Sequence, residues 1–551
     1  MGADPLFRPA PAAADAEDEE DDEPARAVSV GAVAWELRGL ARGRAPGPDG
    51  VSTDLLRAAP PTLAAVLAAL FTGSLRCGFV PSRWRLAWVR MLPKPGRPLS
   101  APGDFRPIAL TSCVGKLLER IVARRLLLVC ERLDLLPPEQ SGFRGGRDAL
   151  EQVVLLTQRT AQHLNGGLCT AVAALDVSKA YDSVWHAGLL YRCREVLPPA
   201  TTRWISSFLG GRSFAILEDG HLSATLPAPG GVPQGSPLSP LLYTFYTRDM
   251  PFLRGQRLRG ATAYADDLAL WAAADSPAAA WASLRPDLDA LAAWGRRWRL
   301  KFNHEKTQAG FFSRQLARWP LGAFASPTFG AVELRWARDI KLLGVRLDRR
   351  LRFLRHAREV CARAGPRVLE LRRLLDTYRR VPAWVGLLLY RCLIRPVLTY
   401  AAPAMVLLCD TGWRAIERLE RRALRAALHT RVATPLDELY QRAKIIPVRR
   451  ESLRLAGGFL LRHASRGNAR LLSSFAPEVA QRADIVRFEE PGDRLLACVP
   501  PRERPAVVAA IHQAAGPFVM PHLSGGNASR GRIHPPTFWG LSPWRPPPVP
   551  D

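Results

Sequence analysis

Two apolar runs that each end on aspartate constrain this chain more than any other feature of its sequence. Residues 170–176 read TAVAALD, and residues 261–267 read ATAYADD. Short apolar runs are typical of buried β-strands, and aspartate is common where a strand gives way to a turn. We therefore expect one strand that ends at Asp176 and a β-hairpin with Asp266 and Asp267 at its turn. If these strands are neighbours in one sheet, the three carboxylates converge.

Converging carboxylates have a specific chemical use. Their oxygen atoms are the ligands that hard divalent cations prefer, and a pair of such cations can clamp the attacking and leaving oxygens of a phosphoryl transfer. The alternative is that these residues are ordinary strand-end aspartates. Either run alone leaves both interpretations open, so the choice depends on the rest of the sequence.

The charge of the chain favours a polyanionic substrate. Its 551 residues include 77 Lys and Arg against 50 Asp and Glu, a net charge of +27. Residues 1–24 hold nine acidic side chains and one basic, so the remainder is more basic still. Such a surface attracts phosphates and releases their counterions. A compositional bias explains the preference for Arg over Lys, but it does not explain the excess of positive charge.

The cysteines and the hydrophobic segments exclude other classes of protein. The nine cysteines are odd in number and form no C-x-x-C pair, which argues against a zinc ribbon or a disulfide framework. We expect free thiols in a reducing compartment. The N-terminus lacks a signal-peptide pattern. The most hydrophobic stretch, residues 383–409, is interrupted by Arg391, Arg395 and Pro396, whereas a membrane span needs roughly 20 apolar residues.

The hydrophobic periodicity predicts helices and strands in mixed order. Residues 1–24 are rich in Ala, Pro and acidic side chains and are expected to be disordered. Strands are expected within residues 84–110, joined by a basic loop, and at the two aspartate-ended runs. The expected helices cover residues 25–42, 52–75, 116–133 and 277–300, with others opening after the glycine-rich loops near 140–150 and 230–238 and a helical region over 351–465.

Eight sequence blocks, in a fixed order, resemble the reverse transcriptases of non-LTR (LINE-type) retrotransposons, and most closely the jockey-like group. The resemblance covers about residues 27–465. The blocks are GRAPGPDGV, LPKPG with DFRPIAL and GKLLERIVARRL, QSGFRGGRDALEQV, LDVSKAYDSV, GVPQGSPLSPLLY, YADD, LKFNHEKT and LLGVRLD.

This resemblance implies an α+β fold of the right-hand polymerase type. The palm would be built on a split βαβ-type antiparallel sheet, flanked by fingers and followed by an α-helical thumb. The arginines of the helical region would then track a nucleic-acid duplex, although a solvated, inert bundle is the alternative. The implied segments are an acidic disordered leader (1–24), fingers and palm (25–348), a helical thumb or connection (349–465) and a partly disordered C-terminal extension (466–551).

The resemblance also implies roles for the residues at the apolar runs. Asp176, Asp266 and Asp267 would be the catalytic carboxylates. Two Mg²⁺ ions, with Mn²⁺ as a substitute, would be held by Asp176, Asp266 and the backbone carbonyl of Val177. Tyr181 would lie under the incoming sugar and exclude a ribose 2′-hydroxyl; the alternative is an aromatic core residue.

Five further residues would contact the incoming nucleotide. Lys94 and Arg106 would grip the triphosphate, the Arg by paired hydrogen bonds and the Lys as a point charge. Gln234 and Gly235 would meet the nucleotide and the template, because glycine lets the backbone approach closely. Lys306 would stand near the leaving pyrophosphate. Solvated surface is the alternative for the basic residues.

The implied function is RNA-directed DNA polymerisation: transfer of deoxynucleotides from dNTPs to the 3′-hydroxyl of a DNA primer on an RNA template. Family members prime on nicked chromosomal DNA, which implies work in the nucleus after cytoplasmic synthesis, without a membrane partner. No endonuclease or ribonuclease H domain is expected in this chain, so the endonuclease would be supplied elsewhere or lost by truncation. A degenerate remnant that only binds nucleic acid is the alternative function. A group II intron maturase or telomerase subunit is disfavoured by the finger and thumb blocks.

Overall fold

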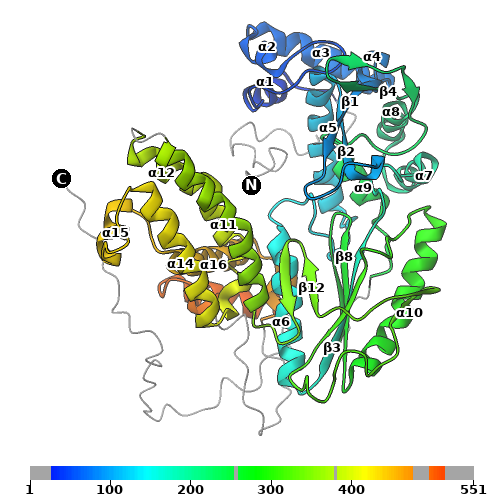
Figure 1. The fold of residues 1–551 in the computed structure, drawn as a ribbon. Helices are drawn as coiled ribbons and strands as arrows, with labels where there is room; N and C mark the ends of the chain where they lie inside the picture. The colour runs from blue at the N-terminus through cyan, green and yellow to red at the C-terminus, as the bar shows by residue number, and fades with distance from the viewer. Residues whose placement is uncertain (1–26, 253–257, 378–380, 476–494, 516–551) are drawn as a thin grey trace.

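The computed structural model describes residues 27–252, 258–377, 381–475 and 495–515. The acidic leader and most of the C-terminal extension lie outside these residues. The described chain has a mixed α+β fold, as the sequence indicated. Figure 1 shows three regions: an N-terminal module, a central sheet between two helices, and a C-terminal helical module.

The N-terminal module combines helices with a small sheet. Its strand order is β2-β1-β4-β5, with β6 also paired to β4. β1 and β2 are the two strands expected within residues 84–110; they pair antiparallel, whereas β1 and β4 run parallel. The elements are α1 Val30–Arg38, α2 Thr53–Ala58, α3 Thr62–Cys77, α4 Ser82–Arg85, β1 Leu86–Pro93, β2 Phe105–Leu110, α5 Cys113–Arg132, β4 Ser213–Glu218, β5 His221–Leu222 and β6 Leu226–Pro227.

The expectation of one continuous helix over residues 52–75 is wrong. Two helices, α2 and α3, cover this stretch, and Pro60 and Pro61 lie between them. Ala59 is extended, with φ −68° and ψ 151°. A residue before proline is pushed out of the helical region by the proline ring, so α2 must end there.

The central sheet has the order β7-β8-β3-β9, and all its pairs are antiparallel. Both aspartate-ended runs are therefore in one sheet: the first is β3, and the second is the β7–β8 hairpin. Helices α6 and α10 lie on opposite sides of this sheet (Figure 1). The elements are α6 Ala149–Asn165, β3 Cys169–Asp176, α7 His186–Val196, α8 Pro199–Leu209, α9 Ser239–Tyr246, β7 Arg259–Tyr264, β8 Asp267–Ala274, α10 Pro277–Arg297 and β9 Gln308–Phe312.

Burial on both faces explains why β3 is apolar without alternation. Ala171, Ala173 and Leu175 belong to one hydrophobic core, and Val172 and Ala174 belong to the other. Successive side chains of a strand point to opposite faces, so a strand covered on both sides needs apolar residues throughout. Asp176, at the end of β3, is the only charged residue of the strand.

The C-terminal helical module follows two short hairpins and packs against the second core, on the α6 side of the sheet. This confirms the helical region expected over 351–465. Its elements are β10 Thr328–Phe329, β11 Val332–Glu333, β12 Asp339–Leu342, β13 Val345–Asp348, α11 Leu354–Thr377, α12 Ala383–Leu389, the π-helical turn η3 Tyr390–Ile394, α13 Arg395–Thr399, η4 Ala404–Leu407, α14 Asp410–Ala427, α15 Leu436–Ala443, α16 Val448–Ser465, α17 Ala469–Ser473 and α19 Arg504–Ala515.

Two expectations about the chain as a whole can be compared with the structure. All nine cysteines lie in described segments and are free thiols. Within those segments, no helix combines the length and the apolar character that crossing a lipid bilayer requires.

Candidate active site

The strand register brings the predicted carboxylates to one edge of the central sheet. Asp176 at the end of β3 is paired directly with Asp267 at the start of β8. Tyr264 pairs with Asp267 across the hairpin, so Ala265 and Asp266 form a two-residue turn. The three aspartates therefore come together on adjacent strands, as the sequence pattern required.

Mutual repulsion and burial change the acidity of this group. Burial, together with the charges of Asp266 and Asp176, raises the pKa of Asp267 to about 6, and Lys306 opposes this rise. Burial also raises the pKa of Asp266, and Asp176 adds to the rise, while Lys306 and Arg106 lower it. Burial is the main cause of these raised pKa values and the neighbouring carboxylates add to it, so a cation bound among them would favour the charged forms. The edge of the sheet is therefore suited to a cation.

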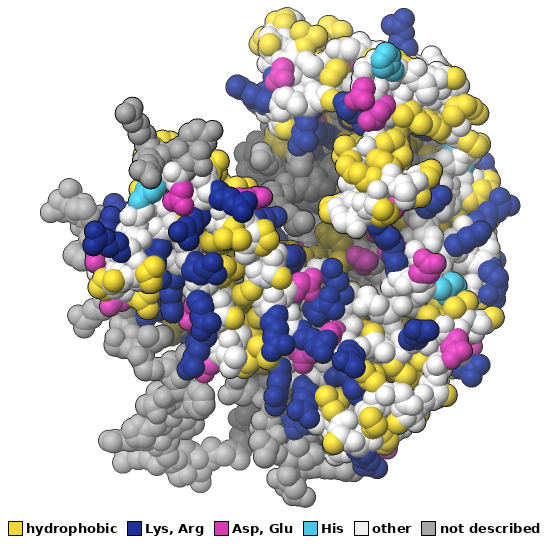
Figure 2. All heavy atoms as spheres, viewed as in Figure 1, with side chains coloured by type: hydrophobic (Ala, Val, Ile, Leu, Met, Phe, Trp, Pro, Cys, Tyr) yellow, Lys and Arg dark blue, Asp and Glu magenta, His cyan; other side chains and the backbone are white. Residues whose placement is uncertain are grey.

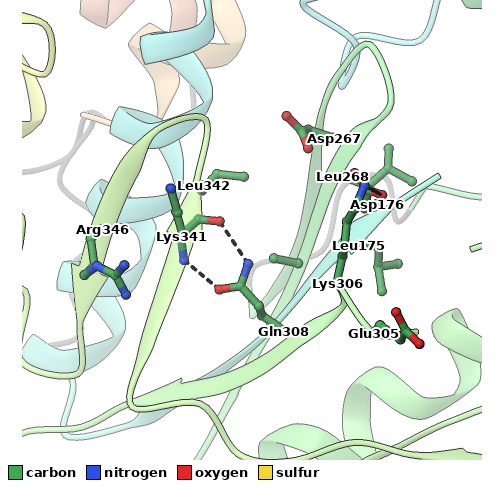
Figure 3. A pocket seen from close by; sticks show the side chains of 11 residues that line it. Leu175, Asp176, Asp267, Leu268, Glu305, Lys306, Gln308, Lys341, Leu342 and Arg346 are labelled. Atoms are coloured by element: carbon green, nitrogen blue, oxygen red, sulfur yellow. Dashed lines mark hydrogen bonds and ion pairs between the residues drawn. The ribbon is translucent and has the colours of Figure 1, made fainter. Parts of the chain in front are cut away.

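Lys306 supplies part of that charge. Its Nζ lies 2.8 Å from Oδ2 of Asp176, and its side chain is 54% exposed. The loop that carries it is held to β3, since the backbone N–H of Asn303 donates to the carbonyl of Asp176 at 2.8 Å. Figure 3 shows Lys306 and Asp176 together in a pocket of about 440 Å³ that Asp267 also lines. The sequence placed Lys306 near the reaction centre but did not anticipate this ion pair.

The donor set fits a hard divalent cation in its chemistry. All the candidate ligands are oxygen atoms, which Mg²⁺ prefers. Within the described residues, however, no group of three or more Asp, Glu, His or Cys side chains is arranged to hold a metal ion. Figure 3 shows the Asp267 carboxylate turned away from Asp176. Val177, whose carbonyl was a predicted ligand, is buried directly after Asp176.

Tyr181 packs on a second aromatic ring beside the aspartates. Its ring stacks on Tyr243 of α9, with centroids 5.5 Å apart and planes at 19°. Tyr243 is fully buried, and burial together with Asp266 and Tyr181 raises its pKa well above the usual value. Tyr181 itself is only partly buried. The ring is thus supported from below and accessible from above, which suits a residue that contacts a sugar.

The loop with Gln234 and Gly235 is bound to the N-terminal module. Gln234 Nε2 donates to Asp182 at 3.1 Å, and the Gln234 carbonyl accepts from the Ala109 N–H at 2.6 Å. Gly235 has φ +126°, and a Cβ there would lie 2.6 Å from the Ala109 carbonyl oxygen. Only glycine fits this approach. A cavity of about 640 Å³ between this loop and strands β1, β2 and β4 lies beside Gln234.

The two basic residues predicted for the triphosphate lie near each other on the β1–β2 pair, where Leu92 is paired with Arg106 and the Lys94 N–H donates to the Asp104 carbonyl. Arg106 on β2 is close enough to lower the pKa of Asp266. Lys94 instead binds within its own loop, where Nζ donates to the Gly103 carbonyl at 2.7 Å. The contact of both residues with the triphosphate stays a prediction.

Sequence reasoning missed three supporting residues. Glu119 on α5 accepts a hydrogen bond from Ser236, next to Gly235, and burial raises its pKa. Gln140 bonds to the β7–β8 turn, and Arg470 bonds to the carbonyls of Pro138 and Ala261. The sequence could have indicated a buried role for Glu119, because this residue lies among the apolar residues of α5. Gln140 and Arg470 carried none, since their partners lie far away in the sequence.

The comparison with protein families agrees with this geometry. The family model described as "Reverse transcriptase (RNA-dependent DNA polymerase)" matches residues 92–347. The matched range contains the three aspartates, Arg106 and Lys306. The chain therefore contains a reverse transcriptase domain over these residues.

The chain is a homologue of the polymerases of jockey-like non-LTR retrotransposons. It is 31% identical to the "Probable RNA-directed DNA polymerase from transposon BS" of Drosophila melanogaster over 414 residues, 73% of this chain and 45% of the relative. It is 29% identical to the "RNA-directed DNA polymerase from mobile element jockey" of the same species over 408 residues, 73% of this chain and 44% of the relative. The chain thus spans less than half the length of these curated relatives.

Among solved structures, apo telomerase from Candida Tropicalis matches with a TM-score of 0.36 and 10% sequence identity. The match covers 82% of this chain and 70% of that one. A likeness this weak supports no argument about the fold.

Proposed function

We propose that this chain is an RNA-directed DNA polymerase of a jockey-like non-LTR retrotransposon. It transfers deoxynucleotides from dNTPs to the 3′-hydroxyl of a DNA primer on an RNA template. The observation that carries the proposal is the register of the central sheet, which places Asp176 opposite Asp267 and beside Asp266. This arrangement lies within the range that matches the reverse transcriptase family.

The residues of the site have different roles in the reaction. Asp176, Asp266 and the Val177 carbonyl would hold two Mg²⁺ ions, which supply activation of the hydroxyl and neutralisation of the phosphates. Asp267 adds negative charge beside them. Lys306, which contacts Asp176, would stand near the leaving pyrophosphate.

Around the carboxylates, other side chains orient the nucleotide. Arg106 faces Asp266 and pairs with the triphosphate. Gln234 and Gly235, on the loop held to β2, meet the base and the template. Tyr181 lies under the sugar, where its ring leaves no room for a 2′-hydroxyl. We expect Tyr181→Ala to raise incorporation of ribonucleotides relative to deoxynucleotides; unchanged sugar discrimination, measured by competition, would refute this role.

The three regions then correspond to the parts of a right-hand polymerase. The N-terminal module acts as fingers, the central sheet as palm and the C-terminal helical module as thumb. Lys and Arg side chains gather over the helical module and the adjoining strands (Figure 2). The exposed arginines of α11 would contact the phosphates of the primer–template duplex. They are Arg355, Arg358, Arg363, Arg367, Arg372 and Arg373.

The proposal concerns polymerisation alone and places this work in the nucleus. The nick that exposes the primer would come from another activity. The competing function is a remnant that binds nucleic acid without extending it. The two functions share the basic surface and differ only in whether the aspartates are used.

Primer extension on an RNA template distinguishes these functions. The unaltered chain should extend a DNA primer in the presence of Mg²⁺, and Asp266→Asn should lower the rate by at least about 1,000-fold through loss of a charged ligand. Asp289→Asn, at an exposed position on α10, is the matched control and should leave the rate unchanged. Retained duplex binding without extension by the unaltered chain would support the remnant instead.

A further inference from the structure

We propose that Gln140 is a positioning residue that holds the turn carrying Asp266 in its reactive geometry. This inference rests on the proposed function and deepens it. Gln140 precedes α6, far from the β7–β8 hairpin in sequence, and its side chain is 3% exposed.

The amide of Gln140 bonds to both polar backbone groups of Ala265. Its Oε1 accepts from the Ala265 N–H at 2.9 Å, and its Nε2 donates to the Ala265 carbonyl at 3.2 Å. Ala265 is the residue immediately before Asp266. The two bonds therefore fix the orientation of the peptide group from which Asp266 extends.

The turn needs this support because its own sequence does not favour its shape. Ala265 has φ +56°, a left-handed conformation that costs a residue with a Cβ about 1 kcal/mol or more. Two-residue hairpin turns usually place glycine, asparagine or aspartate at such a position. Ala265 is also buried, at 9% exposed, so water does not satisfy its backbone groups. The Gln140 amide satisfies them instead.

Gln140 is itself held rigidly against the hairpin. The Ser141 N–H donates to the Ala263 carbonyl, and the Ala263 N–H donates to the Glu139 carbonyl, each at 2.9 Å. Residues 139–141 thus pair with β7 through a single parallel bridge between Gln140 and Ala263. Arg470 of α17 bonds the carbonyl of Pro138 at 2.9 Å from the other side. Because these bonds hold the segment that carries Gln140, the Gln140 side chain keeps its position against the turn.

Gly142 gives an independent indication that this segment is fitted to the turn. A Cβ at Gly142 would lie 2.4 Å from the backbone nitrogen of Ala265. No real Cβ tolerates that distance, so either segment would have to move. The backbone of Gly142 also donates to Oε1 of Gln140 at 2.8 Å.

Loss of the two hydrogen bonds from Gln140 to Ala265 should lower the rate of the chemical step and leave substrate binding unchanged. Asp266 would lose its fixed direction, and a displacement of about 1 Å in a reacting group costs up to about 100-fold in rate. The residues that contact nucleotide and duplex lie on other elements and keep their positions. The expected signature is a lower kcat with an unchanged KM.

The test compares Gln140→Met with Gln152→Met in primer extension. Methionine has similar length and no amide, so the first variant loses both bonds to Ala265. Gln152 on α6 is equally buried and bonds to Ser141, not to the turn, which makes it the matched control. We expect Gln140→Met to lower kcat about 10- to 100-fold. The KM for dNTP and the Kd for duplex should stay within about threefold, and Gln152→Met should keep kcat within the same factor.

If Gln140→Met does not fold, Gly142→Ala replaces it in the test. The added Cβ pushes against the backbone of Ala265 and so disturbs the contact between residues 140–142 and the turn. A wild-type kcat in both variants would overturn the inference. So would an equal loss of kcat in Gln152→Met at a matched fall in melting temperature, because general loosening would then explain the effect. Absence of extension by the unaltered chain would overturn the proposed function, and with it this role of Gln140.

Discussion

The β7–β8 and β12–β13 hairpins have turns of the same length but hold them in different ways. In β12–β13 the turn is Leu343–Gly344, both with positive φ, and glycine adopts this conformation at little cost. In β7–β8 the turn is Ala265–Asp266, without glycine. The first turn has a glycine at one of its two positions and receives one distant hydrogen bond, from the Tyr400 hydroxyl to the Leu343 carbonyl at 2.9 Å. The second has no glycine, and the Gln140 side chain bonds to both backbone groups of Ala265. The difference teaches that a turn without glycine can carry a reactive residue when a side chain from elsewhere in the fold supports its backbone.

The largest expected effect comes from making the two turns alike. Asp266→Gly gives the reactive turn a glycine at the position of Gly344. Activity should fall by at least about 1,000-fold because a charged ligand is lost. The free energy of unfolding should stay within about 1 kcal/mol, since the removed carboxylate was partly buried among like charges. Primer extension and urea unfolding measure the two quantities. A large fall in stability would show that Asp266 serves the turn itself.

The opposite change is Gly344→Ala, which removes the local stabilisation of the other hairpin. Gly344 has φ +80°, so alanine should lower the free energy of unfolding by about 1 to 2 kcal/mol. The kcat should change little, because this turn carries no reacting group. Urea unfolding and steady-state kinetics test this expectation. A loss of activity without loss of stability would mean that the β12–β13 turn also positions a substrate.

The pH dependence of stability tests the raised pKa of Asp267, which begins β8 directly after the reactive turn. The pKa of Asp267 is raised to about 6 in the folded chain, so the folded state binds this proton more tightly than the unfolded state does. Without divalent metal, stability should therefore rise as pH falls from 7 through 6 toward 5. Asp267→Asn should remove this contribution. Melting temperatures of both proteins across that range give the difference; parallel curves would contradict the raised pKa.

The smallest effect is expected for Ala265→Gly. Glycine relieves the cost of the left-handed conformation but adds freedom to the unfolded chain, so stability should change by less than about 1 kcal/mol. The kcat should fall only a few-fold, because the bonds from Gln140 remain. In combination with Gln140→Met, the glycine should recover stability but not kcat. Recovery of both would mean that Gln140 only offsets backbone strain.

Much of the fold followed from local patterns in the sequence. The apolar runs gave β3 and the β7–β8 hairpin, and burial on both faces explains why their periodicity could not show which face was which. The split between α2 and α3 follows from Pro60 and Pro61, which lie between the two helices. Such features depend on neighbouring residues and can be inferred from them.

The support of the site could not be inferred in this way. Gln140 and Ala265 are 125 residues apart, and Arg470 is 209 residues from Ala261. No periodicity links such partners, because the contacts exist only after the sheet and the C-terminal helices have packed. The ion pair between Lys306 and Asp176 is similar: the sequence indicated both residues but not their contact. The roles of these residues in catalysis stay predictions.

The most direct test of the account is the rate of single-nucleotide incorporation on an RNA template, measured together with the duplex Kd. The account predicts Mg²⁺-dependent incorporation by the unaltered chain. It also predicts loss of that rate in Asp266→Asn at an unchanged duplex Kd. Equal rates in the two proteins, or tight duplex binding without incorporation by the unaltered chain, would contradict it.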